Sequence, residues 1–153
     1  MSIVHNPNNW HWIDKNCLPW ANTYLEKNLL NLSASKDDFE MVVSSIKPLT
    51  GDCDVTQRKG KIRCIFELNL EFNIKLINKE LDKDQEDIIY DVKLLEFEHD
   101  QDESDYQFDI KNGRIEYKKL IRDTLIPEVL KVLLKFQPDL LEAQQPSLQH
   151  NTN

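Results

Sequence analysis

Residues 61–76, KIRCIFELNLEFNIKL, alternate between polar and apolar side chains with a period of two. The odd positions are polar or charged except for Ile65, and the even positions are all apolar: Ile62, Cys64, Phe66, Leu68, Leu70, Phe72, Ile74 and Leu76. Because successive side chains of a strand point to opposite faces, this pattern predicts one long strand with a single buried face.

Such a strand is too long for a spherical domain of this size. About 15 residues at roughly 3.3 Å each span on the order of 50 Å. A compact chain of 153 residues has a radius of gyration of about 15 Å, or a diameter of roughly 38 Å. We therefore expect an elongated domain, with this strand as its long axis and the basic turn formed by residues 57–61, QRKGK, at one end.

The segments before this strand predict a helix and one further strand. Residues 16–30 have helical apolar spacing, with Asn16 or Asp14 as the N-cap and Pro19 in the first turn, where its missing N–H costs little. Residues 31–38 are small and polar and are expected to form a connecting loop. Residues 39–49 predict a strand, and residues 51–60 a long charged connection to the central strand.

The segments after it predict two strands and a helix. Residues 88–97 are expected to form a third strand with a bulge near Leu94 and Leu95, where the apolar parity changes, and residues 106–110 a fourth. Helical spacing begins at Arg114 or Tyr117 and continues to residue 137, with one further turn to 142. Pro127 removes one backbone bond, so a kink or break is expected there.

These elements predict an α+β fold that is elongated. It consists of an N-terminal helix, a four-stranded antiparallel meander sheet and a long C-terminal helix. We expect one domain over residues 1–144 and a disordered tail over 145–153. The free chain is expected to be a monomer, because every element finds an apolar partner face within it.

The composition excludes several classes of function. No apolar stretch has the roughly 20 residues that a membrane helix needs, and the N-terminus lacks a signal-peptide pattern, so we expect a protein of the cytoplasm or nucleus that does not bind membranes. The three cysteines have neither disulfide-framework nor zinc-site spacing. No phosphate loop, nucleophile elbow or catalytic constellation is present, so no enzymatic activity, metal or cofactor is expected.

The net charge of −8 is concentrated in one segment. Residues 1–75 carry nine basic and nine acidic side chains, residues 76–110 three and thirteen, and residues 111–153 seven and five. Phosphate binding needs an extended positive surface, so we do not expect nucleic acid as a partner. A nucleic-acid-binding module that uses the basic turn is kept as the alternative function.

Two motifs have both a structural and a functional interpretation. The N-terminal segment, residues 6–12, NPNNWHW, either places Trp10 and Trp12 over the core as a lid or leaves one of them exposed as a contact for a partner. The basic turn is either an ordinary solvated turn or a docking site. Its cations are Arg58, Lys59 and Lys61.

Both motifs together resemble a known family. Residues 6–12 followed by DKN at 14–16, then GDCD at 51–54 leading to QRKGK at 57–61, are similar to the amino-terminal domain of the activators of the ninety-kilodalton heat-shock protein ATPase. SDYQFDI at 104–110 and LIR at 120–122 add to the likeness. It covers essentially the whole chain and is greatest for the short, single-domain form of fungi.

The resemblance implies a co-chaperone function and assigns roles to residues. It implies that Arg58, Lys59 and Lys61 bind the chaperone's middle segment, rearrange its catalytic loop and modestly stimulate its ATPase. Asp52 matches a position that pairs with a basic residue of the chaperone. The same resemblance implies that the N-terminal segment acts on the nucleotide-binding domain, through residues Asn8, Asn9, Trp10, His11 and Trp12.

Overall fold

The computed structural model describes residues 13–80 and 87–149, with the side chains of Ile13 and of residues 145–149 left aside. The order of elements is β1 (Ile13–Asn16), α1 (Leu18–Leu29), β2 (Ser33–Lys36), β3 (Phe39–Ile46), β4 (Thr50–Arg58), β5 (Lys61–Asn78), β6 (Ile88–Glu98), β7 (Phe108–Lys111), α2 (Lys118–Thr124) and α3 (Ile126–Gln149), with 3-10 turns η1 (Glu103–Asp105) and η2 (Ile115–Tyr117).

The antiparallel sheet is organised around β5, the predicted central strand. Residues 61–69 of β5 pair with β4 and residues 72–78 pair with β3, so that β3 and β4 act as two halves of one strand interrupted at Lys47, Pro48 and Leu49. The other edge of β5 pairs with β6, which pairs with β7. The predicted four-stranded meander is therefore confirmed, with β2 and β1 added outside β3 and β4.

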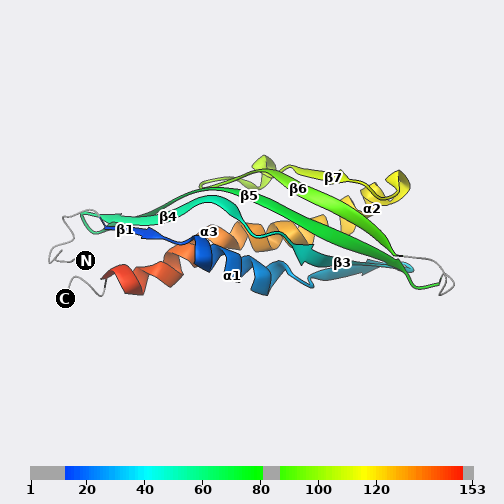
Figure 1. The fold of residues 1–153 in the computed structure, drawn as a ribbon, viewed down its shortest axis with the longest axis horizontal. Helices are drawn as coiled ribbons and strands as arrows, with labels where there is room; N and C mark the ends of the chain where they lie inside the picture. Colours follow the sequence, from blue (N-terminus) through cyan, green and yellow to red (C-terminus); the bar gives the residue numbers. More distant parts are fainter. Residues whose placement is uncertain (1–12, 81–86, 150–153) are drawn as a thin grey trace.

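The molecule is elongated, as its longest strand requires (Figure 1). The helices α1 and α3 lie along one face of the sheet, and the even-numbered side chains of β5 from Cys64 to Leu76 are buried beneath them. At the centre Phe136 of α3 is fully buried, and its ring packs against four other rings: Trp20, Tyr24, Phe66 and Phe97. None of the described helices is long and apolar enough to cross a membrane.

The predicted helices are present, with two corrections. The N-cap of α1 is Cys17, which makes no side-chain capping bond, so the expected cap at Asn16 or Asp14 is wrong: both residues belong to β1. Asn16 Oδ1 does accept a hydrogen bond from the Leu18 N–H at 3.0 Å. The helical region after Tyr117 breaks between Thr124 and Ile126, and Pro127 lies in the first turn of α3. The expected end at 137 or 142 is wrong, because α3 continues to Gln149 and makes residues 145–149 of the expected disordered tail helical.

The long connection expected over 51–60 is also wrong. Residues 50–58 form β4, and a two-residue turn at Lys59 and Gly60 joins β4 to β5. Cys53, Val55 and Gln57 alternate towards the core, but the buried polar Gln57 hides the pattern in the sequence. Likewise, the loop expected over 31–38 contains β2, whose residues are exposed or half-buried and which is held by pairing with β3.

The bulge expected in β6 is confirmed. Leu68 pairs with Phe97 and Leu70 pairs with Leu94, so that β6 carries one more residue than β5 over this interval. The extra residue lets both Leu94 and Phe97 point into the core, while Leu95 stays 53% exposed.

Candidate interaction site

A tight hairpin carries the basic turn. Lys59 has φ 53° and Gly60 has φ 79°, and these two residues connect the last cross-strand pair, Arg58 and Lys61. Two central residues with positive φ form the type I′ turn, whose twist matches that of the flanking strands. The turn thus places Arg58, Lys59 and Lys61 at the tip of a projecting hairpin (Figure 1, left).

The strand register adds a fourth cation to this tip. Thr56 pairs with Arg63, and Arg58 pairs with Lys61, so that Arg63 lies one step behind Lys61 on the same outer face of the sheet. A hollow of about 450 Å³ is lined by Thr56, Arg58, Lys59, Lys61 and Arg63. We call the four cations Arg58, Lys59, Lys61 and Arg63 the basic tip.

The basic tip is available to a partner. All four cations are exposed. Within the described residues, Lys59, Lys61 and Arg63 form no salt bridge, whereas five other salt bridges join surface side chains of the sheet and helices. The exposed charges of Lys59, Lys61 and Arg63, which have no ion pair among the described residues, attract an acidic surface most strongly at low salt.

Further along the same outer face the charge changes sign. Asp54 pairs with Ile65, and Asp52 pairs with Glu67. Ile65 is 50% exposed there, an apolar side chain between the basic and acidic groups. Asp52 is exposed on the same face as Arg58, and the separation along β4 is about 20 Å at roughly 3.3 Å per residue. From the tip along the strands, the outer face therefore presents first cations, then one large apolar side chain, and then carboxylates.

The structure brings some expected site residues together and leaves others aside. Arg58, Lys59 and Lys61 are adjacent, and Asp52 lies apart on the same face. The expected contacts Asn8, Asn9, Trp10, His11 and Trp12 lie outside the described residues.

Neither Arg63 nor Ile65 was expected in the site from the sequence alone. Arg63 occupies a polar position of the strand pattern, where a solvated side chain is the ordinary expectation. Ile65 was visible as the one apolar residue at an odd position, and that irregularity is the signal that marks it.

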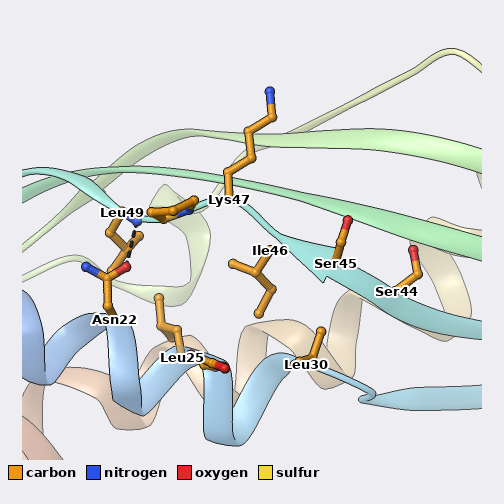
Figure 2. Close-up of a pocket in the computed structure, with 10 residues that line it drawn as sticks. Asn22, Leu25, Leu30, Ser44, Ser45, Ile46, Lys47 and Leu49 are labelled. Atoms are coloured by element: carbon orange, nitrogen blue, oxygen red, sulfur yellow. Dashed lines mark hydrogen bonds between the residues drawn. The ribbon is translucent and has the colours of Figure 1, made fainter.

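A second hollow, of about 460 Å³, lies between α1 and the junction of β3 and β4 (Figure 2). Leu25 and Leu30 line it on the helix side, and the Asn22 Oδ1 accepts a hydrogen bond from the Leu49 N–H at 2.7 Å. Lys47 points away from the hollow in Figure 2. A bulge at Ser44 and Ser45 and the break before Leu49 move the strand away from α1, so we interpret this hollow as a consequence of strand geometry.

The cysteines belong to the core. Cys17, Cys53 and Cys64 are buried free thiols. Burial raises the pKa of Cys53 to about 12 and that of Cys64 to about 11, and it also raises the pKa of Cys17. All three are therefore protonated and unreactive at neutral pH. Among the described residues, no group of His, Cys, Asp or Glu is arranged to hold a metal ion.

Comparison with known families places the chain. Residues 14–144 match the family described as "Activator of Hsp90 ATPase, N-terminal". The chain belongs to this family. The Hsp90 co-chaperone HCH1 of Saccharomyces cerevisiae is 40% identical over 152 residues, which are 96% of this chain and 99% of that protein. The basic tip is thus part of a domain whose relatives are Hsp90 co-chaperones.

Two further comparisons agree with this Hsp90 activator family. The Hsp90 co-chaperone AHA1 of the same yeast is 36% identical over 157 residues, which cover 96% of this chain but only 44% of that longer protein. The crystal structure of Aha-1 from Plasmodium falciparum has a TM-score of 0.62 and covers 92% of this chain and 90% of its own. At 24% identity this last likeness supports the fold alone.

Proposed function

We propose that this chain is a co-chaperone that binds the middle segment of the ninety-kilodalton heat-shock chaperone, rearranges its catalytic loop and modestly stimulates its ATPase. The observation that carries the proposal is the basic tip, which presents four exposed cations at the end of the β4–β5 hairpin. The printed names of the relatives, Hsp90 co-chaperones and activators of the Hsp90 ATPase, supply the partner.

The proposed mechanism is electrostatic docking of the tip. Lys59, Lys61 and Arg63 have no internal counter-ion among the described residues, so an acidic surface of the middle segment can supply it. Once docked, the fixed positive charge of the tip favours one arrangement of the chaperone's catalytic loop. The chain thus acts on its partner's ATPase without being a catalyst itself.

The rest of the outer face supports orientation. Asp52 lies on the same face as Arg58, and we assign it to a basic residue of the chaperone. With cations at the tip and carboxylates behind them, only one direction along the partner satisfies both signs. The N-terminal segment, with Asn8, Asn9, Trp10, His11 and Trp12, acts on the nucleotide-binding domain in this proposal.

The same charge distribution disfavours nucleic acid as a ligand. A duplex or single strand would carry phosphates past the tip and onto Asp52, Asp54 and Glu67, which line the outer face behind it. Repulsion there would offset the attraction at the tip. We further propose that the free chain is a monomer of the cytoplasm or nucleus, where the chaperone is available.

Charge removal at the tip tests the proposal. Lys59→Ala combined with Lys61→Ala should weaken binding to the full-length chaperone at least about tenfold, about 1.4 kcal/mol, and abolish ATPase stimulation. The matched control is Lys93→Ala combined with Lys111→Ala, two exposed cations of β6 and β7 away from the tip. Equal loss in both double variants would mean that overall charge, and not the tip, determines binding.

A further inference from the structure

Next to the basic tip, one edge of the central strand has no strand beside it among residues 13–80 and 87–149. The pairing of β6 with β5 ends at Glu67 and Glu98. Beyond it, the His99 N–H donates to the Phe66 carbonyl oxygen at 3.1 Å, and the Phe66 N–H donates to the His99 Nδ1 at 3.2 Å. Residues 61–65 then continue with β4 on one edge and with no described strand on the other (Figure 1).

Strand geometry decides which backbone groups face this free edge. In an antiparallel sheet the N–H and C=O of one residue point to the same side, and those of the next residue point to the other. Because Phe66 bonds towards the β6 side, Cys64 and Ile62 present their N–H and C=O groups to that side as well. Arg63 and Ile65 are directed to β4.

A hollow runs along the free edge and gives it room for another chain. It has a volume of about 410 Å³, and its lining includes Ile62, Cys64 and Ile65 of β5, closed at one end by His99 and Asp100. Gln137 and Leu141 of α3 line it on the helix side. The N–H and C=O groups of Ile62 and Cys64, which pair with no strand on this side among the described residues, thus lie beside a partly apolar wall. This is the arrangement that an added strand needs.

We propose that this edge accepts an extended acidic segment of the chaperone as an additional strand, continuing the line of β6 along residues 61–65 of β5. This inference rests on the proposed function and describes how that partner is held. The backbone of the added strand forms hydrogen bonds with the N–H and C=O groups of Ile62 and Cys64.

The register predicts the side chains of the added strand. Positions opposite Ile62 and Cys64 face the helix side and must be apolar, because they cover the half-buried Leu141. Positions opposite Lys61 and Arg63 face the outer side, where carboxylates complement two cations. The segment that fits therefore alternates apolar and acidic residues.

Charge argues against a second copy of this chain at the same edge. Edge-to-edge pairing of two copies would bring the Lys61 and Arg63 side chains of both onto one short ribbon. Inward or edge cations of this kind are a known protection against such association. An acidic strand at this edge would instead be attracted by Lys61 and Arg63.

Residue-resolved hydrogen exchange of the whole chain, with and without full-length chaperone, tests the inference. On binding, the amides of Ile62 and Cys64 should slow at least about tenfold, whereas those of Arg63 and Ile65, already bonded to β4, should change little. Calorimetry on the same samples establishes that the complex has formed.

Each other outcome overturns the inference in a recognisable way. Binding heat without protection of Ile62 and Cys64, or with equal slowing of all four amides, refutes the added strand and leaves the proposed function standing. Absence of binding heat refutes both. Protection that grows with the concentration of this chain alone would assign the edge to a second copy.

A substitution gives an independent readout. Ile62→Pro removes an N–H that faces the free edge and not β4, so the hairpin can keep its internal bonds. It should weaken binding at least about tenfold with little change in melting temperature. Unchanged affinity in a folded variant contradicts the inference, and if this variant does not fold, the exchange pattern of the unsubstituted chain decides.

Discussion

The turn residue Lys59 allows stability and binding to be separated. Its φ of 53° lies in the left-handed region, where a side chain with a Cβ costs roughly 1–2 kcal/mol. Lys59→Gly removes that cost, while the greater freedom of glycine in the unfolded chain offsets about 0.4–1 kcal/mol. Lys59→Gly should therefore stabilise the fold by up to about 1 kcal/mol, or about 2–4 °C in melting temperature for a chain of this length.

Lys59→Ala is the matched comparison, because it removes the same charge but keeps the Cβ in the left-handed conformation. Its melting temperature should stay close to that of the unsubstituted chain. Both variants lose one cation of the basic tip, so both should lose the same affinity for the chaperone, about tenfold or about 1.4 kcal/mol at low salt.

Thermal melting and calorimetric titration with full-length chaperone measure the two effects. A lower melting temperature for Lys59→Gly than for Lys59→Ala would refute the assignment of strain to this turn. If one variant bound as tightly as the unsubstituted chain, charge at this position would not be what the chaperone recognises.

Three further predictions follow from the core and the sheet. Gly51→Ala should destabilise by about 2–4 kcal/mol in denaturant unfolding, because φ is +115° and a Cβ would collide with the Glu67 carbonyl oxygen. Gln57→Met should raise the melting temperature, because Gln57 is fully buried and neither polar atom of its amide has a partner among the described residues, a cost of about 1–3 kcal/mol. The free energy of unfolding should fall as pH rises above about 9, because burial holds the pKa of Cys53 near 12 in the folded state, so the thiol of the unfolded chain loses its proton first. In pH-dependent unfolding, a Cys53→Ala variant should show a shallower fall of this free energy.

The elements that could be predicted from the sequence are those whose apolar residues recur with a single, regular spacing. The alternation from Ile62 to Leu76 identified β5 and the elongated shape, and the parity change near Leu94 identified the bulge of β6. It did not identify β4, since Gly51 has low strand propensity and the inward-facing Gln57 is polar. Only the pairing with β5 fixes β4, and that is a tertiary effect.

The end of α3 was missed for a related reason. Beyond the expected end at residue 137 the chain contains Pro138 and Pro146, each of which removes a backbone bond. In the fold, Phe136, Leu140 and Gln144 continue one buried stripe along the helix, and this packing outweighs the local cost of Pro138.

The candidate site was predictable in its charges but not in its shape. Arg58, Lys59 and Lys61 are close together in the sequence, so the cluster of charge is visible there. Arg63 and Ile65 join them only because the two-residue turn sets the cross-strand register, which the expected long connection could not supply. The free edge of β5 also depends on where β6 ends, and no local pattern marks that point.

Site-specific photo-crosslinking shows which end of the molecule contacts the chaperone. A photoreactive amino acid at position 59, on the basic tip, is compared with one at position 79, an exposed position just beyond the far end of β5. If the basic tip docks on the chaperone, position 59 should crosslink to the middle segment and position 79 should not. A chaperone adduct from position 79 together with none from position 59 would contradict it.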